Sequence, residues 1–194
     1  MRRLAFTDGN LSEAAATLLG GGVVVLPTDT VYGIACRPDC PDALERIRAM
    51  KRRDAQKPFQ LLVDSSETAW ALGASRTPQS EVLARLWPGA LTLVLPVPGG
   101  TEGFRVPAMP RLRALLRACG GALRCTSANL SGEPPAIEAD AAQTLAAQAD
   151  LLLDGGPSPV GQASTVAALD AQGRLTILRQ GVCRLPALPG RDLV

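Results

Sequence analysis

Short apolar runs alternate along this chain with longer segments in which apolar residues recur every three or four positions. The short runs are rich in β-branched residues and too brief for helices, so they predict strands, whereas the longer periodic segments predict helices. The predicted strands are residues 23–26, 59–63, 90–97, 103–106, 122–125 and 151–154, followed by a hairpin of residues 164–166 and 175–179. The predicted helices are residues 10–19, 41–51, 65–72, 77–86, 110–119 and 139–148.

The order of these elements predicts the fold class. Strands that alternate with helices, together with a hairpin late in the chain, are typical of an α/β protein with a twisted mixed sheet flanked by helices. A length of 194 residues fits one such domain over residues 1–194, with a core large enough to be stable without disulfide bonds or a structural metal. Residues 185–194 are expected to form a loose C-terminal tail.

A polar loop follows the first predicted strand. Pro27 ends the strand because proline lacks the N–H that a central strand must donate. The loop then carries four oxygen-bearing side chains, those of Thr28, Asp29, Thr30 and Tyr32. Ligands of α/β proteins bind at strand ends, so these groups suit a small polar ligand. A turn in which Thr28 and Asp29 bond their own backbone explains them equally well.

A second strand end repeats this pattern. The apolar run 122–125 passes into Thr126, Ser127, Ala128 and Asn129. Two strand ends rich in hydroxyl and amide groups suggest two walls of one pocket. Ser127 has no visible general base beside it in the sequence, so a nucleophilic role is not favoured.

Four cations lie at the ends of predicted elements: Lys51, Arg53, Arg105 and Arg179. If they converge, they would hold a polyphosphate and neutralise charge that develops on phosphorus. For Lys51 and Arg53, a solvated basic end that offsets the helix dipole remains an alternative. Arg105 interrupts an apolar strand end and needs an anion. The chain contains neither the P-loop nor the G-x-G-x-x-G motif.

Composition narrows the chemistry. The chain contains no histidine, which excludes Ser-His-Asp and Cys-His catalysis and leaves positioning and charge, as in nucleotidyl transfer. Five cysteines without a CxxC pair predict reduced thiols and no zinc site. The chain has no apolar run of membrane-spanning length and no apolar segment behind the N-terminal arginines, so a cytoplasmic protein is expected. A net charge of +2 permits a nucleic-acid partner.

Seven sequence blocks together resemble the YrdC/TsaC family, the threonylcarbamoyl-AMP synthases. They are PTDTVYG at 27–33, K-x-R at 51–53 with a proline at 58, WPGALTLVL at 87–95, RVP at 105–107, TSANLSG at 126–132, STV at 164–166 and RQG at 179–181. The resemblance runs in order from about residue 11 to residue 182. Seven blocks in sequence are far more specific than any one of them.

The resemblance implies a twisted mixed sheet with a concave basic cleft. It implies an enzyme that condenses L-threonine, bicarbonate or CO2, and ATP into threonylcarbamoyl-adenylate and pyrophosphate. The product would supply a transferase that modifies the adenosine beside the anticodon of tRNA. Magnesium is expected on the ATP phosphates, because no carboxylate cluster offers a separate metal site. The cleft would also suit tRNA or double-stranded RNA.

The resemblance also assigns roles to residues. On the threonine side it places Thr30, with Tyr32 and Ser164 beside it, and it places Thr126 at the junction of the two substrates. It assigns the ATP side to Lys51, Arg53, Arg105, Ser127, Asn129 and Arg179. Lys51 and Arg53 would stabilise the transition state while a carbamate oxygen attacks the α-phosphorus.

One departure and two alternatives qualify this interpretation. Many relatives carry histidine shortly after the R-x-P block, where this chain has Ala108, Met109 and Pro110, and that histidine helps to hold threonine in some of them. The chain resembles the short form, without the C-terminal domain of longer relatives. One alternative is a paralogue that binds nucleotide or RNA without catalysis. The other is a carbamoyl-transfer enzyme, whose relatives carry this fold within much longer chains.

Overall fold

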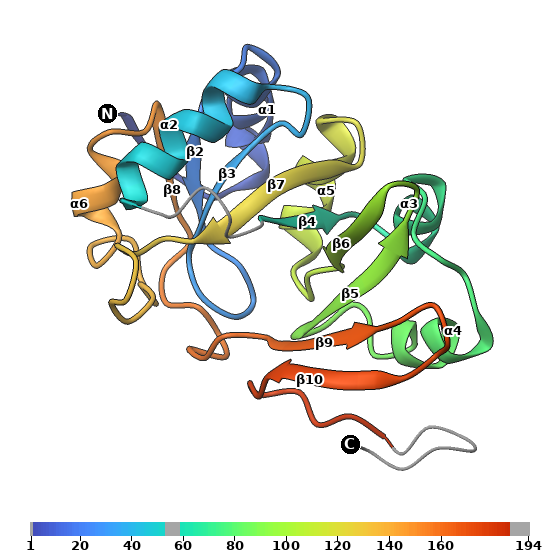
Figure 1. Ribbon diagram of the computed structural model, residues 1–194. Coiled ribbons are helices and arrows are strands. Elements are labelled where there is room, and N and C mark those ends of the chain that lie inside the picture. The colour runs from blue at the N-terminus through green and yellow to red at the C-terminus, as the bar shows by residue number, and fades with distance from the viewer. Residues whose placement is uncertain (1, 53–58, 187–194) are drawn as a thin grey trace.

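A single mixed sheet of ten strands organises the described part of the chain (Figure 1). The computed structural model describes residues 2–52 and 59–186. The strands are β1 (Arg2–Ala5), β2 (Val24–Leu26), β3 (Gly33–Cys36), β4 (Gln60–Val63), β5 (Leu91–Val97), β6 (Gly100–Arg105), β7 (Ala122–Ser127), β8 (Leu151–Asp154), β9 (Thr165–Leu169) and β10 (Leu175–Arg179). The helices are α1 (Leu11–Leu19), α2 (Pro41–Lys51), α3 (Ser66–Ala71), α4 (Pro78–Ala84), α5 (Pro110–Ala118) and α6 (Gln143–Ala146), with a 3-10 turn η1 (Asp8–Asn10).

The strand order is β1-β8-β2-β3-β7-β4-β6-β5-β9-β10, and the pairing is mixed as predicted. Parallel pairs join β1 to β8, β2 to β8, β4 to β6 and β5 to β9. The pairs β2–β3, β5–β6 and β9–β10 are antiparallel, as are the pairings of β7 with β3 and β4. The strands of each parallel pair are far apart in the chain, which leaves room for the crossover helices that parallel pairing requires.

The sheet has two faces at each of its two ends, which gives four areas. Three hydrophobic clusters cover three of these areas. At the β2–β3 end, α1 and α5 pack on one face, and α2 and α6 pack on the other. At the β5–β9 end, one face packs against α3 and α4 through Leu91, Leu93, Leu95 and Phe104. Figure 1 shows α1 and α2 over one end of the sheet and α3 and α4 beside the other. The side chains of Thr92 and Val94 alternate with this apolar row and face a cavity instead.

Most predicted elements are confirmed, and the differences have local causes. β1 was not predicted because it begins with two arginines on an exposed edge strand, and β3 was not predicted because it follows a polar loop. The predicted helix 139–148 shortens to α6. Asn10 does not cap α1; its amide nitrogen donates to the carbonyl oxygen of Ala5 at 2.9 Å. The predicted cap at Thr77 is confirmed.

Three further expectations concern the whole chain. All five cysteines are free thiols, as predicted. Within residues 2–52 and 59–186, no helix is long and apolar enough to cross a bilayer. Of the predicted loose tail, residues 187–194 lie outside the described part of the chain.

Gly33 marks a tight contact between the two halves of the site. It begins β3 and pairs with Ser127 of β7, so it lies beneath both polar loops. A Cβ atom at this position would stand 2.6 Å from Sγ of Cys125 and 3.4 Å from the carbonyl oxygen of Thr126. The absence of a side chain therefore lets the two loops approach each other.

We expect Gly33→Ala to lower the free energy of unfolding by about 1–3 kcal/mol, because the added methyl group overpacks a closed contact. Urea denaturation measures the change. Gly100→Ala is the control, since nothing lies within 4 Å of its added Cβ. Combining Gly33→Ala with Cys125→Ala removes the clashing sulfur and should cost less than the sum of the two single changes; strict additivity would contradict this explanation.

Candidate active site

The uncovered area of the sheet forms the floor of a cavity of about 410 Å³. The strand residues that line this floor are Gln60, Thr92, Val94, Gly103, Arg105 and Val166. The walls come from the loop 27–32, the loop that follows β7, the residues before β9 and the end of β10. A cavity of this size is in the range of small-molecule sites.

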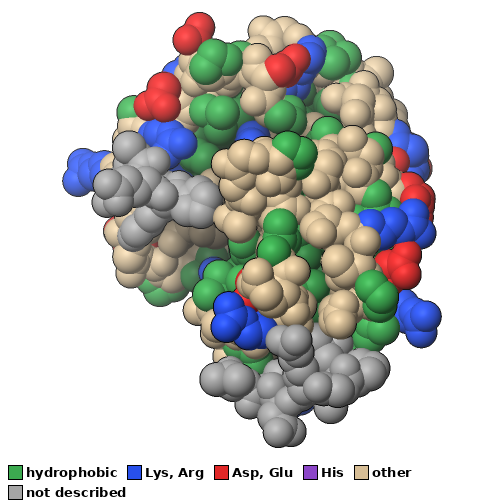
Figure 2. Space-filling view, turned by 45° about the vertical axis from the view of Figure 1, so that its right-hand side comes forward, with side chains coloured by type: hydrophobic (Ala, Val, Ile, Leu, Met, Phe, Trp, Pro, Cys, Tyr) green, Lys and Arg blue, Asp and Glu red, His purple; other side chains and the backbone are tan. Residues whose placement is uncertain are grey.

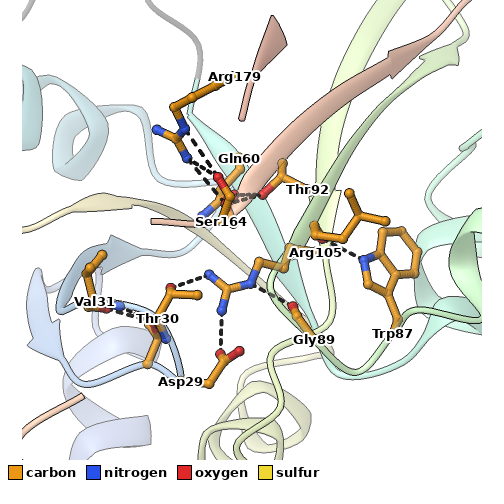
Figure 3. Close-up of polar contacts among 12 residues, drawn as sticks. Asp29, Thr30, Val31, Gln60, Trp87, Gly89, Thr92, Arg105, Ser164 and Arg179 are labelled. Atoms are coloured by element: carbon orange, nitrogen blue, oxygen red, sulfur yellow. Dashed lines mark hydrogen bonds and ion pairs between the residues drawn. The ribbon is translucent and has the colours of Figure 1, made fainter. Parts of the chain in front are cut away.

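Arg105, the last residue of β6, is held in a buried ion pair. Its Nη2 donates to the carboxylate of Asp29, and the two side chains are 2% and 6% exposed. Its Nη1 donates to Oγ1 of Thr30 at 2.7 Å, and its Nε donates to the carbonyl oxygen of Gly89 at 3.1 Å. The sequence predicted an anion for Arg105, and this anion is supplied by the protein itself (Figure 3).

The hydroxyl groups of the 27–32 loop continue from this ion pair. Oγ1 of Thr28 donates to the carbonyl oxygen of Val31 at 2.7 Å and accepts the backbone N–H of Thr30 at 3.1 Å. Since the proton of Thr28 is used, the 2.9 Å contact between the two threonine hydroxyls has Thr30 as its donor. The turn alternative therefore holds for Thr28, whereas the carboxylate of Asp29 pairs with Arg105.

A second arginine begins a matching chain on the opposite wall. Arg179 donates to the carbonyl oxygen of Ser164 from Nε at 3.2 Å and from Nη2 at 2.9 Å. Its Nη2 also contacts Oγ of Ser164 at 3.3 Å. Oγ of Ser164 lies 2.9 Å from Oγ1 of Thr92, which donates to Oε1 of Gln60 at 2.7 Å. Figure 3 shows Ser164 and Thr92 between the two guanidinium groups in that view.

The glycine of the RQG block supports Ser164 from behind. The N–H of Gly181 donates to Oγ1 of Thr165 at 3.0 Å, and that hydroxyl donates to the carbonyl oxygen of Cys183 at 2.6 Å. A Cβ at Gly181 would clash with the carbonyl oxygen of Ala163. The close approach of two backbones therefore fixes the start of β9.

Lys51 organises the loop that follows β7 from beneath. It is fully buried at the end of α2, and it does not line the cavity. Its ammonium group donates to the carbonyl oxygen of Ser127, and to the carbonyl oxygen and Oδ1 of Asn129 at 2.6 and 3.1 Å. The hydroxyl of Ser127 also donates to Oδ1 of Asn129, at 2.6 Å. Arg53 lies outside the described residues.

Within residues 2–52 and 59–186, the charged groups in and beside the cavity are of both signs. Burial, and then the positive charge of Arg105, lower the pKa of Arg179. Arg179 has no carboxylate partner among the described residues, whereas Arg105 is neutralised by Asp29 and the lining also includes Glu133. Figure 2 shows charged side chains of both signs mostly at the margin of the visible face.

Cys125 is the one cavity-lining thiol in the described part of the chain. Burial raises its pKa to about 12, so it stays protonated near neutral pH. A protonated thiol is a poor nucleophile, which leaves the cavity without covalent chemistry from this residue. The arrangement is therefore suited to binding and charge stabilisation.

The cavity brings together most, but not all, of the predicted site residues. Those that line it are Thr30, Arg105, Thr126, Ser127, Asn129, Ser164 and Arg179. Tyr32 does not line it: its ring is buried in the cluster with α2 and α6, and its hydroxyl donates to the carbonyl oxygen of Gly156 at 2.8 Å. Met109 also lies outside the lining and packs against the cluster with α1 and α5.

Sequence reasoning missed two polar residues of the floor, Gln60 and Thr92. Both lie in predicted strands: Thr92 stands between buried Leu91 and Leu93, and Gln60 directly precedes the buried run of β4. A polar residue in an otherwise apolar strand was the available signal, since a buried hydroxyl or amide needs a partner.

Comparison with known proteins gives a consistent result. The Sua5/YciO/YrdC family model, described as "Telomere recombination", matches residues 16–181. A threonylcarbamoyl-AMP synthase of Alkalilimnicola ehrlichii is 39% identical over 181 residues, which cover 86% of this chain and 94% of the relative. A protein of the same name from Bacillus subtilis is 35% identical over 84% of this chain, which spans about half (51%) of that relative.

The fold is likewise similar to a solved structure. P. abyssi Sua5 complexed with L-threonine superposes with a TM-score of 0.81 at 30% sequence identity. The similarity covers 93% of this chain and 56% of P. abyssi Sua5.

The buried ion pair gives a direct test of how the site is held. We expect Asp29→Ala to lower the free energy of unfolding by about 3–5 kcal/mol, because it leaves the guanidinium of Arg105 buried without its counter-ion. The double change Asp29→Leu with Arg105→Met should recover much of this loss, since it leaves no buried charge. Chemical denaturation measures both.

The control is the exposed pair of Arg37 and Asp39, where Asp39→Ala should cost less than about 1 kcal/mol. An equal loss of unfolding free energy in Asp29→Ala and Asp39→Ala would show that the buried pair stabilises the protein no more than an exposed pair does.

Proposed function

Because the chain belongs to the Sua5/YciO/YrdC family, we propose that it is a threonylcarbamoyl-AMP synthase. It condenses L-threonine, bicarbonate or CO2, and ATP into threonylcarbamoyl-adenylate and pyrophosphate. One observation carries the proposal: a single cavity contains most of the residues expected on the threonine side and most of those expected on the ATP side. Relatives of that name also cover most of this chain.

The two hydrogen-bonded chains suggest where each substrate binds. Thr30 and Ser164 each accept from an arginine, and each donates its own proton to a neighbouring hydroxyl. Their remaining lone pairs suit the ammonium group or hydroxyl of an amino acid. Ser127 and Asn129, on the loop that Lys51 holds, and Arg179 on the facing wall suit the nucleotide.

The reaction needs positioning rather than a protein nucleophile. The amine of threonine adds to the carbon of bicarbonate, with loss of water, and gives a carbamate. A carbamate oxygen then forms a bond to the α-phosphorus of ATP, and the bond to the departing pyrophosphate breaks. Arginine donors that are already oriented stabilise the charge at phosphorus without reorganising. The complete absence of histidine is compatible with this chemistry.

A magnesium ion would be carried by the phosphates of ATP. The described residues contain no group of three His, Cys, Asp or Glu side chains able to hold a metal ion. Magnesium usually keeps several waters and binds through substrate phosphates, so such a site requires few protein ligands. When bound, it would offset the negative charge of the pyrophosphate.

The product would feed tRNA modification. A downstream transferase would move the threonylcarbamoyl group from the adenylate to the adenosine beside the anticodon. Synthesis is favoured over the alternative of RNA binding without catalysis, because the polar groups converge in one cavity of small-molecule size. A nucleic-acid surface would instead require a broad positive stripe, and the face in Figure 2 carries both signs of charge.

The first test is pyrophosphate release from ATP by the purified protein. With ATP, threonine and bicarbonate all present, we expect steady release, and omission of either threonine or bicarbonate should abolish it. Release that requires neither co-substrate would indicate a simple ATPase. No release under any condition, with RNA still bound, would favour the binding alternative.

Lys51 gives a second test. We expect Lys51→Ala to reduce kcat/KM by about 100-fold, because the carbonyl groups of Ser127 and Asn129 lose their shared donor and the loop that follows β7 loses its shape. The measurement is steady-state pyrophosphate release as a function of ATP concentration, with threonine and bicarbonate saturating. Arg117→Ala, at an exposed position near the end of α5, removes an equal charge and should leave turnover unchanged. Full turnover by Lys51→Ala would exclude this role.

A further inference from the structure

Within the described residues, only one of the two polar atoms of the Gln60 amide has a hydrogen-bond partner. Gln60 begins β4 and lies on the cavity floor, opposite Cys125 of β7. Its Oε1 accepts the hydroxyl of Thr92 at 2.7 Å. Its Nε2 has no partner among the described residues, although the rest of the polar network on this floor is paired. Two N–H donors are therefore left for a ligand.

The hydroxyl of Thr92 fixes the orientation of this amide. It donates to Oε1 of Gln60, so the proton in its contact with Ser164 comes from Ser164. Oγ of Ser164 in turn accepts from the guanidinium group of Arg179. The oxygen of the Gln60 amide therefore faces Thr92, and its nitrogen is turned away.

We propose that Gln60 recognises a carboxylate-type oxyanion of the substrate through its Nε2 donors, and that Thr92 positions it for this role. The proposal rests on the proposed function and refines it, because it names the chemical group of the substrate that the floor of the cavity recognises. Gln60 would contact the substrate itself, whereas Thr92 acts through Gln60.

The surroundings favour a planar anion with a single charge. Beside Gln60, the floor is formed by Val94 and Gly103, which offer no charge. Of the two arginines in the described lining, Arg105 is paired with Asp29, and the proposed function places Arg179 on the nucleotide side. A neutral amide donor matches the single charge of a carboxylate better than the several charges of a polyphosphate.

Two substrates carry this chemistry: the carboxylate of threonine, and bicarbonate with the carbamate that it forms. Gln60→Glu tests both, because it keeps an oxygen for Thr92 and the same shape but replaces the donor with a negatively charged acceptor. We expect KM to rise about 10- to 100-fold for the substrate that Gln60 contacts, with KM for ATP unchanged. A rise for threonine alone identifies its carboxylate, and a rise for bicarbonate alone identifies the carbonate-derived group.

Two further variants separate recognition from folding. Thr92→Val removes the hydroxyl that orients Gln60, so it should raise the same KM by a smaller factor. Gln148→Glu makes the same change of charge at an exposed position outside the cavity lining and should leave all three KM values unchanged. An unchanged KM in Gln60→Glu, or an equal rise for all three substrates, would overturn the proposal.

Calorimetry separates failure of this proposal from failure of the proposed function. If the wild-type protein releases no pyrophosphate, the synthase function fails, and binding of L-threonine and of bicarbonate then decides the role of Gln60. Weaker binding of either one to Gln60→Glu supports that role; unchanged binding, or no binding of either to the wild type, overturns it. If Gln60 contacts the carboxylate of threonine, L-threoninamide should bind to Gln60→Glu as tightly as L-threonine does, because its amide can donate to the new carboxylate.

Discussion

The buried pair of Asp29 and Arg105 is the constraint on which the site depends. A buried guanidinium is stable only with a counter-ion and filled hydrogen bonds, and Arg105 finds these in two different segments. Asp29 and Thr30 come from the β2–β3 loop, whereas Gly89 comes from the turn before β5. The pair therefore joins the half of the sheet with helices on both faces to the half where one face forms the cavity floor. A shift of either half would expose or separate the two charges.

The hydroxyl groups of the cavity are oriented along two hydrogen-bonded chains that begin at the arginines. Guanidinium groups only donate, and the far ends of the chains donate to the carbonyl oxygen of Val31 on one wall and to the amide oxygen of Gln60 on the other, which fixes the direction of each hydroxyl between them. The proton positions are thus set before any ligand arrives. Such fixed donors and acceptors supply the preorganisation that an enzyme without histidine requires.

The alternating hydrophobic pattern predicted the mixed sheet, because strands buried on at least one face carry regular apolar rows. The sequence also predicted that Arg105 has an anionic partner, since an arginine in an apolar strand must be paired. Its partner could not be identified, because Asp29 is 76 positions away in the chain and only the fold brings them together. Tyr32 and Lys51 show the same limit. Both are in polar sequence blocks beside the cavity, yet the hydroxyl of Tyr32 bonds to the backbone at Gly156 and Lys51 binds the loop from beneath.

Strand β5 shows how the fold separates stability from recognition. Leu91, Leu93 and Leu95 face the cluster with α3 and α4, whereas Thr92 and Val94 face the cavity. The two sets are interleaved along one strand but contact different surroundings. Substitutions at the even-numbered positions can therefore change what the cavity selects while the odd-numbered positions keep the core intact. A strand of this kind allows substrate preference to diverge among descendants without a new fold having to be stabilised each time.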